Sequence, residues 1–209
     1  GNKITVHQED SNVAVDNDAI ISGDLDLEIQ TNGATTLDLA GTSGNFRDVI
    51  INHANCVATL LSATTIDRNL TITAGELDTN SSSNYALTVT GQTEIGPGSG
   101  GSDQATLTCN ASTLSLGSGR TSSYALIVNQ GGTFAGGSGT HTIGSIEVKN
   151  NSNAKCTLTS GVTTIDSEKT SANRAISIDG TNATFDDGNG TVKLTNPAST
   201  VLKTNFNDL

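Results

Sequence analysis

The chain repeats itself, and the repeat limits the folds that are open to it. The segment YALTVTGQTEIGPGSG, which begins at Tyr85, aligns without gaps to YALIVNQGGTFAGGSG, which begins at Tyr124, with seven of sixteen positions identical. A second pair relates TLTCNASTLSL, which begins at Thr106, to TLTSGVTTIDS, which begins at Thr157. The offsets of the two pairs differ. A shorter unit of variable length explains both, and such units are typical of repeat architectures whose insertions lie in loops.

Each unit contains a short strand with alternating apolar residues, a corner rich in Gly or Asn, a second short strand and a polar turn. The apolar residues that open successive units are unevenly spaced: Leu87, Leu107, Leu126, Ile146, Leu158, Ile176 and Val192. The second strands end at Ile95, Leu114, Phe134, Ile165, Phe185 and Val201. The chain has 23 glycines and only 2 prolines, which favours many tight, ordered turns between extended segments.

A unit of this length cannot bury its own apolar face, because strict alternation points one side of a strand inward and the other outward. Stacked units pair backbone to backbone at about 4.8 Å and align their Val, Ile and Leu side chains in interior ladders. We therefore predict an all-β fold, a single-stranded β-solenoid (β-helix) with coils of about 16–20 residues. An antiparallel β-sandwich is the alternative, because it also has short strands at regular spacing.

We expect one elongated β domain over residues 1–209, with clear coils in residues 69–206 and a less regular, acidic part in residues 1–68. Hydrophobic residues make up 33% of the chain and aromatic residues 3%, which suits a thin core of stacked Val, Ile, Leu and Thr. The cysteines, Cys56, Cys109 and Cys156, are odd in number and widely spaced, which predicts buried thiols rather than a zinc site or a disulfide framework.

The formal net charge is −11, and acidic residues dominate the first part of the chain. Such a surface repels phosphate backbones, so we expect no nucleic-acid partner. The acidity favours solubility in a salty or extracellular setting. No apolar run approaches the roughly 20 residues of a membrane span, and we identify no signal peptide. A chain that starts at Gly1 and contains no Met is expected to be a processed or tagged product, or a piece of a longer chain.

Glycine-rich segments raise the question of a cation site. GGSGTHTIG, residues 136–144, resembles the nonapeptide of calcium-binding β-roll repeats, but His141 occupies its aspartate position. GNGTVKL, residues 188–194, likewise has Val192 at that position. The clusters FDDGNG, residues 185–190, and VDND, residues 15–18, lack the spacing of a calcium loop and are interpreted as turns. We expect no metal site, and we place His141 at an exposed corner.

The three histidines, His7, His53 and His141, lie far apart in the chain, and no HExxH motif or Ser-His-Asp order accompanies them. Basic and aromatic residues are scarce, which leaves few groups to hold a sugar. We therefore predict a non-enzyme with no catalytic residues, no cofactor-binding residues and no cofactor. A polysaccharide-cleaving β-helix enzyme with paired acids such as Asp186 and Asp187 is a less favoured alternative.

Triplets of the form Thr-x-Thr resemble the ladder of ice-binding β-solenoids; they begin at Thr71, Thr88, Thr106, Thr140 and Thr157. An ice-binding face requires such triplets on consecutive coils. The stretch between Thr106 and Thr140 reads SYA at the corresponding position, which interrupts the ladder. The preference of Thr for strands accounts for most of the pattern.

Coils such as ALIVNQGGTFAGGSGTHTIG, residues 125–144, resemble those of β-helical surface fibres, namely phage tail or capsid fibres and bacterial adhesin passengers related to filamentous haemagglutinin. The resemblance covers residues 69–206. It implies a structural or adhesive module of a virion fibre or decoration protein, placed on the virion or outside the cell, with a segment of a bacterial surface adhesin as the alternative. The implied partners are further copies of the chain, usually in a trimer, other structural proteins of the same particle, and a host surface glycan.

Overall fold

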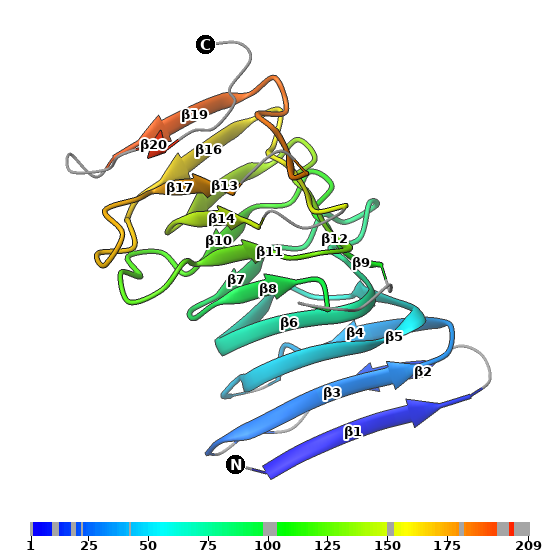
Figure 1. Ribbon diagram of the computed structural model, residues 1–209. Helices are drawn as coiled ribbons and strands as arrows, with labels where there is room; N and C mark the ends of the chain where they lie inside the picture. Colours follow the sequence, from blue (N-terminus) through cyan, green and yellow to red (C-terminus); the bar gives the residue numbers. More distant parts are fainter. Residues whose placement is uncertain are drawn as a thin grey trace.

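The protein is built from stacked β-strands. The structure is a computed structural model that describes residues 2–9, 13–17, 20–21, 23–41, 43–97, 104–149, 153–179, 182–195 and, by backbone alone, 201–202. In this part of the chain twenty strands form one continuous hydrogen-bonded sheet, and no helix is present. Figure 1 shows the strands stacked along one direction from the N-terminus to the C-terminus.

The sheet wraps around three sides, which we call faces A, B and C. Face A contains β1 (Asn2–Gln8), β3 (Leu25–Thr31), parts of β5 (Phe46–Leu60) and β6 (Thr64–Asp78), β8 (Thr93–Ile95), β11 (Leu126–Val128), β14 (Ile146–Val148), β17 (Ile176–Ile178) and β20 (Val201–Leu202). Face B contains β2 (Val13–Asp16), β4 (Ala34–Asp38), the C-terminal parts of β5 and β6, β9 (Ala105–Thr108), β12 (Gly132–Ala135), β15 (Lys155–Thr157) and β18 (Thr184–Asp186). Face C contains the N-terminal part of β6, β7 (Leu87–Val89), β10 (Leu114–Leu116), β13 (Thr140–Ile143), β16 (Val162–Ile165) and β19 (Thr191–Leu194).

Every pairing between these strands is parallel, and each strand from β7 to β17 pairs with the strand three places further along the chain. The predicted all-β solenoid is therefore confirmed. A sandwich of antiparallel strands is excluded for the described residues, because antiparallel pairing is limited there to one isolated bridge between Lys169 and Arg174.

The predicted coil length of about 16–20 residues fits the coil from Leu126 to Ile146, but most coils after β6 are longer than the unit seen in the sequence. On face C, Leu87 pairs with Leu114, which pairs with His141, so one coil runs from each of these residues to the next. The coil from Thr93 to Leu126 on face A is longer still. The physical reason is that each coil has three strands and three corners, whereas the unit visible in the sequence has two strands.

One of the two repeats in the sequence relates strands on different faces, and the other relates strands two coils apart on the same face. The offset from Tyr85 to Tyr124 relates β7 on face C to β11 on face A, so it reuses a strand and corner on a different side. The larger offset, from Thr106 to Thr157, also carries Phe134 onto Phe185. It has a direct structural counterpart, because Phe134 pairs with Cys156 and Cys156 pairs with Phe185. These three side chains form one column on face B.

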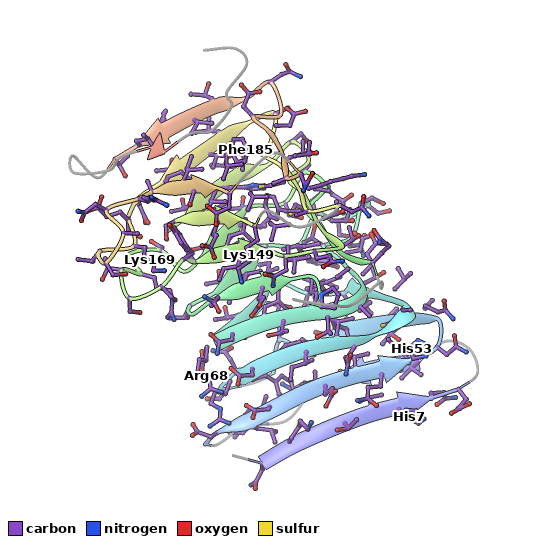
Figure 2. All side chains as sticks on the ribbon, in the orientation of Figure 1. His7, His53, Arg68, Lys149, Lys169 and Phe185 are labelled. Atoms are coloured by element: carbon purple, nitrogen blue, oxygen red, sulfur yellow. The ribbon has the colours of Figure 1, made fainter. Side chains whose placement is uncertain are left out.

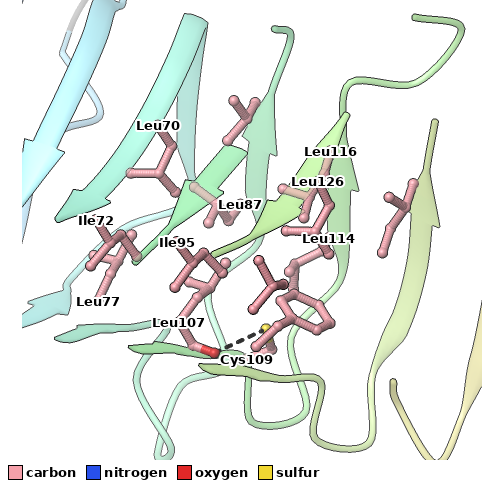
Figure 3. Packing of buried hydrophobic residues seen from close by; sticks show 14 of the residues in the cluster. Leu70, Ile72, Leu77, Leu87, Ile95, Leu107, Cys109, Leu114, Leu116 and Leu126 are labelled. Carbon is pink, nitrogen blue, oxygen red and sulfur yellow. Dashed lines mark hydrogen bonds between the residues drawn. The ribbon is translucent and has the colours of Figure 1, made fainter. Parts of the chain in front are cut away.

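The core consists of columns of inward-pointing side chains, one from each coil. The longest apolar column on face A contains Val6, Ile29, Ile51, Ile72, Ile95, Val128, Val148 and Ile178. From Ile29 to Val148 these side chains are fully buried. Figure 3 shows how Ile72 and Ile95 from this column meet Leu87, Leu107 and Leu114 from the other two faces. The alternation in the sequence thus places one thin apolar core inside the coils.

Corners in the C-terminal part stack so closely that backbone conformation restricts the residue type. Gly137 has a φ of 64°, and a Cβ atom there would clash with the backbone carbonyl of Asn110 in the preceding coil. Asn110 itself has a φ of 51°. The Ser138 amide donates a hydrogen bond of 2.6 Å to the Asn110 carbonyl, which ties the two corners together. Gly and Asn are the residues that adopt this left-handed conformation at least cost.

Candidate functional site

The structure keeps the three histidines apart. His7 lies on β1 and is exposed, with its Nε2 atom 3.4 Å from Glu9 Oε1. His53 lies on β5, near the same end of the molecule, as Figure 2 shows. His141 lies on β13, within the later coils. The structure therefore assembles no catalytic group from these residues.

His141 is fully buried, so its predicted position at an exposed corner is wrong. It belongs to the inward column of face C, between Leu114 and Thr163. Its ring packs edge-on against Phe134, with centroids 6.0 Å apart. The glycines before it do form a corner, but the alternation THTI directs His141 and Ile143 to the same side. That alternation is visible in the sequence and is the signal that the sequence analysis missed.

Neither ring nitrogen of His141, Nδ1 or Nε2, makes a hydrogen bond of normal geometry. Burial lowers the pKa of the imidazole from 6.5 to about 4, and the nearby backbone of Ser112 opposes part of this change. Thr163, its partner on β16, also has a buried Oγ1 atom without a hydrogen bond. Two adjacent coils therefore bury polar groups that are left unsatisfied, at a cost of about 1–3 kcal/mol for each such group.

The thiols of Cys56, Cys109 and Cys156 are buried and free, as predicted. Burial raises the pKa of all three, and it does so most strongly for Cys109 and Cys156. A buried thiol with a raised pKa stays protonated and unreactive. Within the described ranges, no group of three or more His, Cys, Asp or Glu side chains is arranged to hold a metal ion.

The acidic pair Asp186 and Asp187 stabilises a turn. Asp186 Oδ1 accepts a hydrogen bond of 2.8 Å from the Gly188 amide, and Asp187 Oδ1 accepts one of 2.9 Å from the Asn189 amide. These contacts are typical of Asp residues at turns. The other acidic cluster, at residues 15–18, includes Asp18, which lies outside the described residues.

Ion pairs connect neighbouring coils on the N-terminal part of face A. Arg47 donates to Asp26 with both Nε, at 2.8 Å, and Nη2, at 2.7 Å. Its Nη1 atom also donates to Asp24, at 2.8 Å. Arg68 forms the same kind of two-point contact with Asp48 on the coil before it. The acidic N-terminal part is thus less repulsive than its charge suggests, because some carboxylates are paired across coils.

Glu28 is the most strongly perturbed carboxylate of this network. The Lys3 ammonium lies 2.5 Å from Glu28 Oε2, and Asn52 and Gln30 donate to Oε1. These contacts, with Lys3 first and Asn52 second, lower the pKa of Glu28 from 4.5 to about 2. Glu28 therefore holds β1 to β3 as an anion, which makes its role structural.

Two long corner loops, residues 117–125 and 166–175, interrupt the regular outline between faces C and A. They meet across the intervening coil, whose corner at residues 144–145 is short. Asp166 accepts hydrogen bonds from the Ser118 hydroxyl, at 2.5 Å, and the Gly119 amide, at 3.1 Å. The Thr170 amide donates to the Thr121 carbonyl, at 3.0 Å. We call this pair of loops the loop clamp; Figure 1 shows it projecting from the stack of coils.

The loop clamp carries side chains that the sequence analysis did not identify as a group. Lys169 lies 4.9 Å from the ring centroid of Tyr124, a cation–π contact between the two loops. Glu147, on β14, is half-buried, and its pKa is raised by that burial. In Figure 2, Lys169 and Lys149 lie at the same level of the stack. The lengths of the loops were visible in the sequence, but their contact depends on how the coils stack.

The Thr-x-Thr triplets do not form one ladder, because they lie on three faces. Thr71 is on face A, Thr88 and Thr140 begin triplets on face C, and Thr106 and Thr157 lie on face B. Face C does carry a row of outward hydroxyls in register on five successive strands: Thr65, Thr88, Ser115, Thr142 and Thr164.

The chain matches no protein-family model, no curated protein and no solved structure. The fold class rests on strand pairing alone, which defines a parallel β-solenoid with three strands in each coil after β6. No helix in the described residues is long and apolar enough to cross a membrane.

Proposed function

We propose that the chain is a non-enzymatic structural module, a stiff spacer or contact surface in a virion fibre or decoration protein that works on the virion or outside the cell. The observation that carries the proposal is the in-register column from Val6 to Ile178, which joins successive coils on face A. Each coil adds backbone hydrogen bonds along the axis as well as apolar contacts. Solenoids built in this way are extended and present long side surfaces.

The outer surface supports a role in contact rather than in turnover. The chain has a net charge of −11, and its acidic side chains include turn-forming and paired carboxylates, as at Asp186 and Asp26. The proposed partners are further copies of the chain in a trimer, other structural proteins of the same particle, and a host surface glycan. The two corners of the loop clamp, residues 117–125 and 166–175, are the longest between strands that the structure describes in full, so the loop clamp is the region we assign to partner contact.

The native mass of the purified chain tests the proposal. It is measured by light scattering before and after dilution and compared with migration in SDS without boiling. A detergent-resistant trimer supports the virion fibre. A stable monomer contradicts the trimeric fibre and favours a segment of a bacterial adhesin.

A separate assay tests the non-enzymatic part of the proposal. The chain is incubated with acidic and neutral polysaccharides, and new reducing ends are measured against a boiled sample. An unchanged polysaccharide supports a structural role. Release of reducing ends that persists through purification contradicts it.

A further inference from the structure

The inward column of face C changes character along the molecule. It begins with Thr64 and continues through Leu87 and Leu114, and it then reaches His141 and Thr163. Leu87 and Leu114 are buried apolar residues, whereas His141 and Thr163 are buried polar residues with unsatisfied atoms. The pairing of β13 with β16 therefore places two buried residues with unsatisfied polar atoms next to each other in this column.

The surroundings of His141 offer no charge that would stabilise an imidazolium. From β10 it meets Leu114, from β12 Phe134, and from β16 Thr163, none of which titrates. The titratable groups in the neighbouring interior of face B are the thiols of Cys109 and Cys156, and burial raises the pKa of both, which keeps them neutral. Only burial and the backbone of Ser112 act on the imidazole, and no charged side chain contributes.

The loop clamp bridges the same coil from outside. Its contacts join residues before β13 to residues after β16 and include the Asp166 carboxylate with Ser118 and Gly119. The Ser167 hydroxyl also donates to the Arg120 carbonyl, at 3.0 Å. The Ser167 amide donates to the Gly144 carbonyl, at 3.0 Å, so the clamp is also attached to the corner of the coil inside it. The strands of a solenoid coil pair with those of its two neighbouring coils, so on face C the coil containing β13 joins β10 to β16, and the loop clamp connects the same two coils from outside.

We propose that the coil containing β13 is an acid-triggered breaking point, at which protonation of His141 separates β13 from β16 on face C. A ring nitrogen takes a proton from hydronium, and the resulting cation meets only the backbone of Ser112 and no charged side chain in the apolar interior. Separation of the strands admits water to the imidazolium, which removes the cost of burying the charge. The loop clamp then opens, because the corner that it spans has moved. This inference does not depend on the proposed role in a fibre.

Hydrogen exchange read by mass spectrometry on the whole chain tests this inference, at about pH 7 and about pH 4.8, corrected for the intrinsic pH dependence of exchange. We expect the β13 and β16 peptides to lose protection by about tenfold or more on acidification. Peptides from β3 and β5 are expected to stay protected. Uniform loss of protection along the chain, or loss that begins in β3, overturns the proposal.

Two variants identify the group that responds. His141→Gln keeps a polar side chain that does not titrate in this range, so its β13 and β16 peptides are expected to keep their protection at both pH values. His141→Leu provides the same test with an apolar side chain, in case Gln prevents folding. His7→Gln, at an exposed histidine, is the matched control and is expected to behave like the parent chain. A response that persists in both His141 variants overturns the proposal.

The Asp166 carboxylate of the loop clamp is the alternative explanation for an acid response. Asp166→Asn removes its titration and leaves His141 in place. We expect the acid response of β13 and β16 to remain in this variant. If the response disappears in Asp166→Asn, the clamp carboxylate is the sensor and the role proposed for His141 is wrong.

Discussion

The N-terminal coils, β1 to β6, and the C-terminal coils, β7 to β20, have the same inward columns but hold them in different ways. In the N-terminal coils β5 and β6 each continue from one face onto the next. In the C-terminal coils the described strands are short, and each stays on one face. The described ion pairs all lie at or before Arg68, whereas the non-glycine residues described with positive φ are all Asn, at Asn80 or later.

This difference shows that a solenoid can turn its corners in two ways. In the first region the strand bends while it stays paired, and side chains such as Arg47 and Arg68 connect the coils from outside. In the second region the chain breaks its pairing at each corner and relies on residues that accept a left-handed backbone. Corner substitutions should therefore harm the second region most, and charge substitutions should harm the first.

The largest expected effect applies to the column that both regions share. Val128→Asp places a carboxylate in a fully buried position of face A. An unpaired charge there should lower the free energy of unfolding by about 4 kcal/mol or more and unfold the neighbouring coils. Circular dichroism during urea unfolding measures the loss. The control is Ser115→Asp on the outward side of face C; a similar loss in both variants would contradict the assigned column.

Corner substitution in the C-terminal coils should have the next largest effect. Gly137→Ala combines a positive φ with a Cβ atom that clashes with the Asn110 carbonyl, so the corners must separate. We expect a loss of about 3 kcal/mol. The matched control is Gly119→Ala, where φ is 73° and no atom lies within 4 Å of the new Cβ. That variant should lose only about 1 kcal/mol, from backbone strain alone. Equal losses would show that stacked corners do not limit the fold.

Acid should weaken the C-terminal coils before the N-terminal ones. The folded-state pKa of His141 is about 4, below its ordinary value of 6.5, so the unfolded chain binds more protons between these pH values. Neutral His141 allows the full free energy of unfolding above pH 6.5. This free energy decreases as pH falls toward about 4, by about 3 kcal/mol in total. Urea midpoints are measured across this pH range in the parent chain and in His141→Gln. An equal dependence of the midpoint on pH in both proteins would refute the prediction.

The Glu28 carboxylate should respond at lower pH. Its folded-state pKa is about 2, below the ordinary value of 4.5, so the stability it contributes is present above pH 4.5 and is lost as pH falls toward 2. Exchange in β1 should therefore begin to increase at a lower pH than exchange in β13. Hydrogen exchange at several pH values orders the two events, and simultaneous opening would contradict the difference between the regions.

The smallest effect is expected from the exposed end of the ion-pair network. Arg68→Gln removes the contact with Asp48, but half of the Arg68 side chain is exposed, so solvent already weakens the attraction. The thermal midpoint should fall slightly in low salt and less in high salt, because salt screens the pair. Thr142→Gln, on the outward face of the C-terminal coils, should show no salt dependence. If the thermal midpoint of Thr142→Gln also changed with salt, the salt effect in Arg68→Gln would not come from the ion-pair network.

The local pattern of the sequence determined the kind of fold. Alternation over a few residues defines which side chains of a strand share a side, and the recurrence of YALxV and TLT indicates units that stack. The same pattern predicted the buried thiols and most of the column residues, such as Leu87 and Leu126. These features depend on neighbours in the chain, so they can be recognised without a structure.

Only the tertiary structure decided how many strands close a coil, because closure depends on the angles at successive corners and on pairing between residues as distant in the chain as Thr93 and Leu126. That number determines which unit lies above which, and hence that His141 is stacked between Leu114 and Thr163. It also brings the loops at residues 117–125 and 166–175 together across a whole coil. Which residues of two coils meet depends on the lengths and angles of all the corners between them. A local sequence pattern does not specify these.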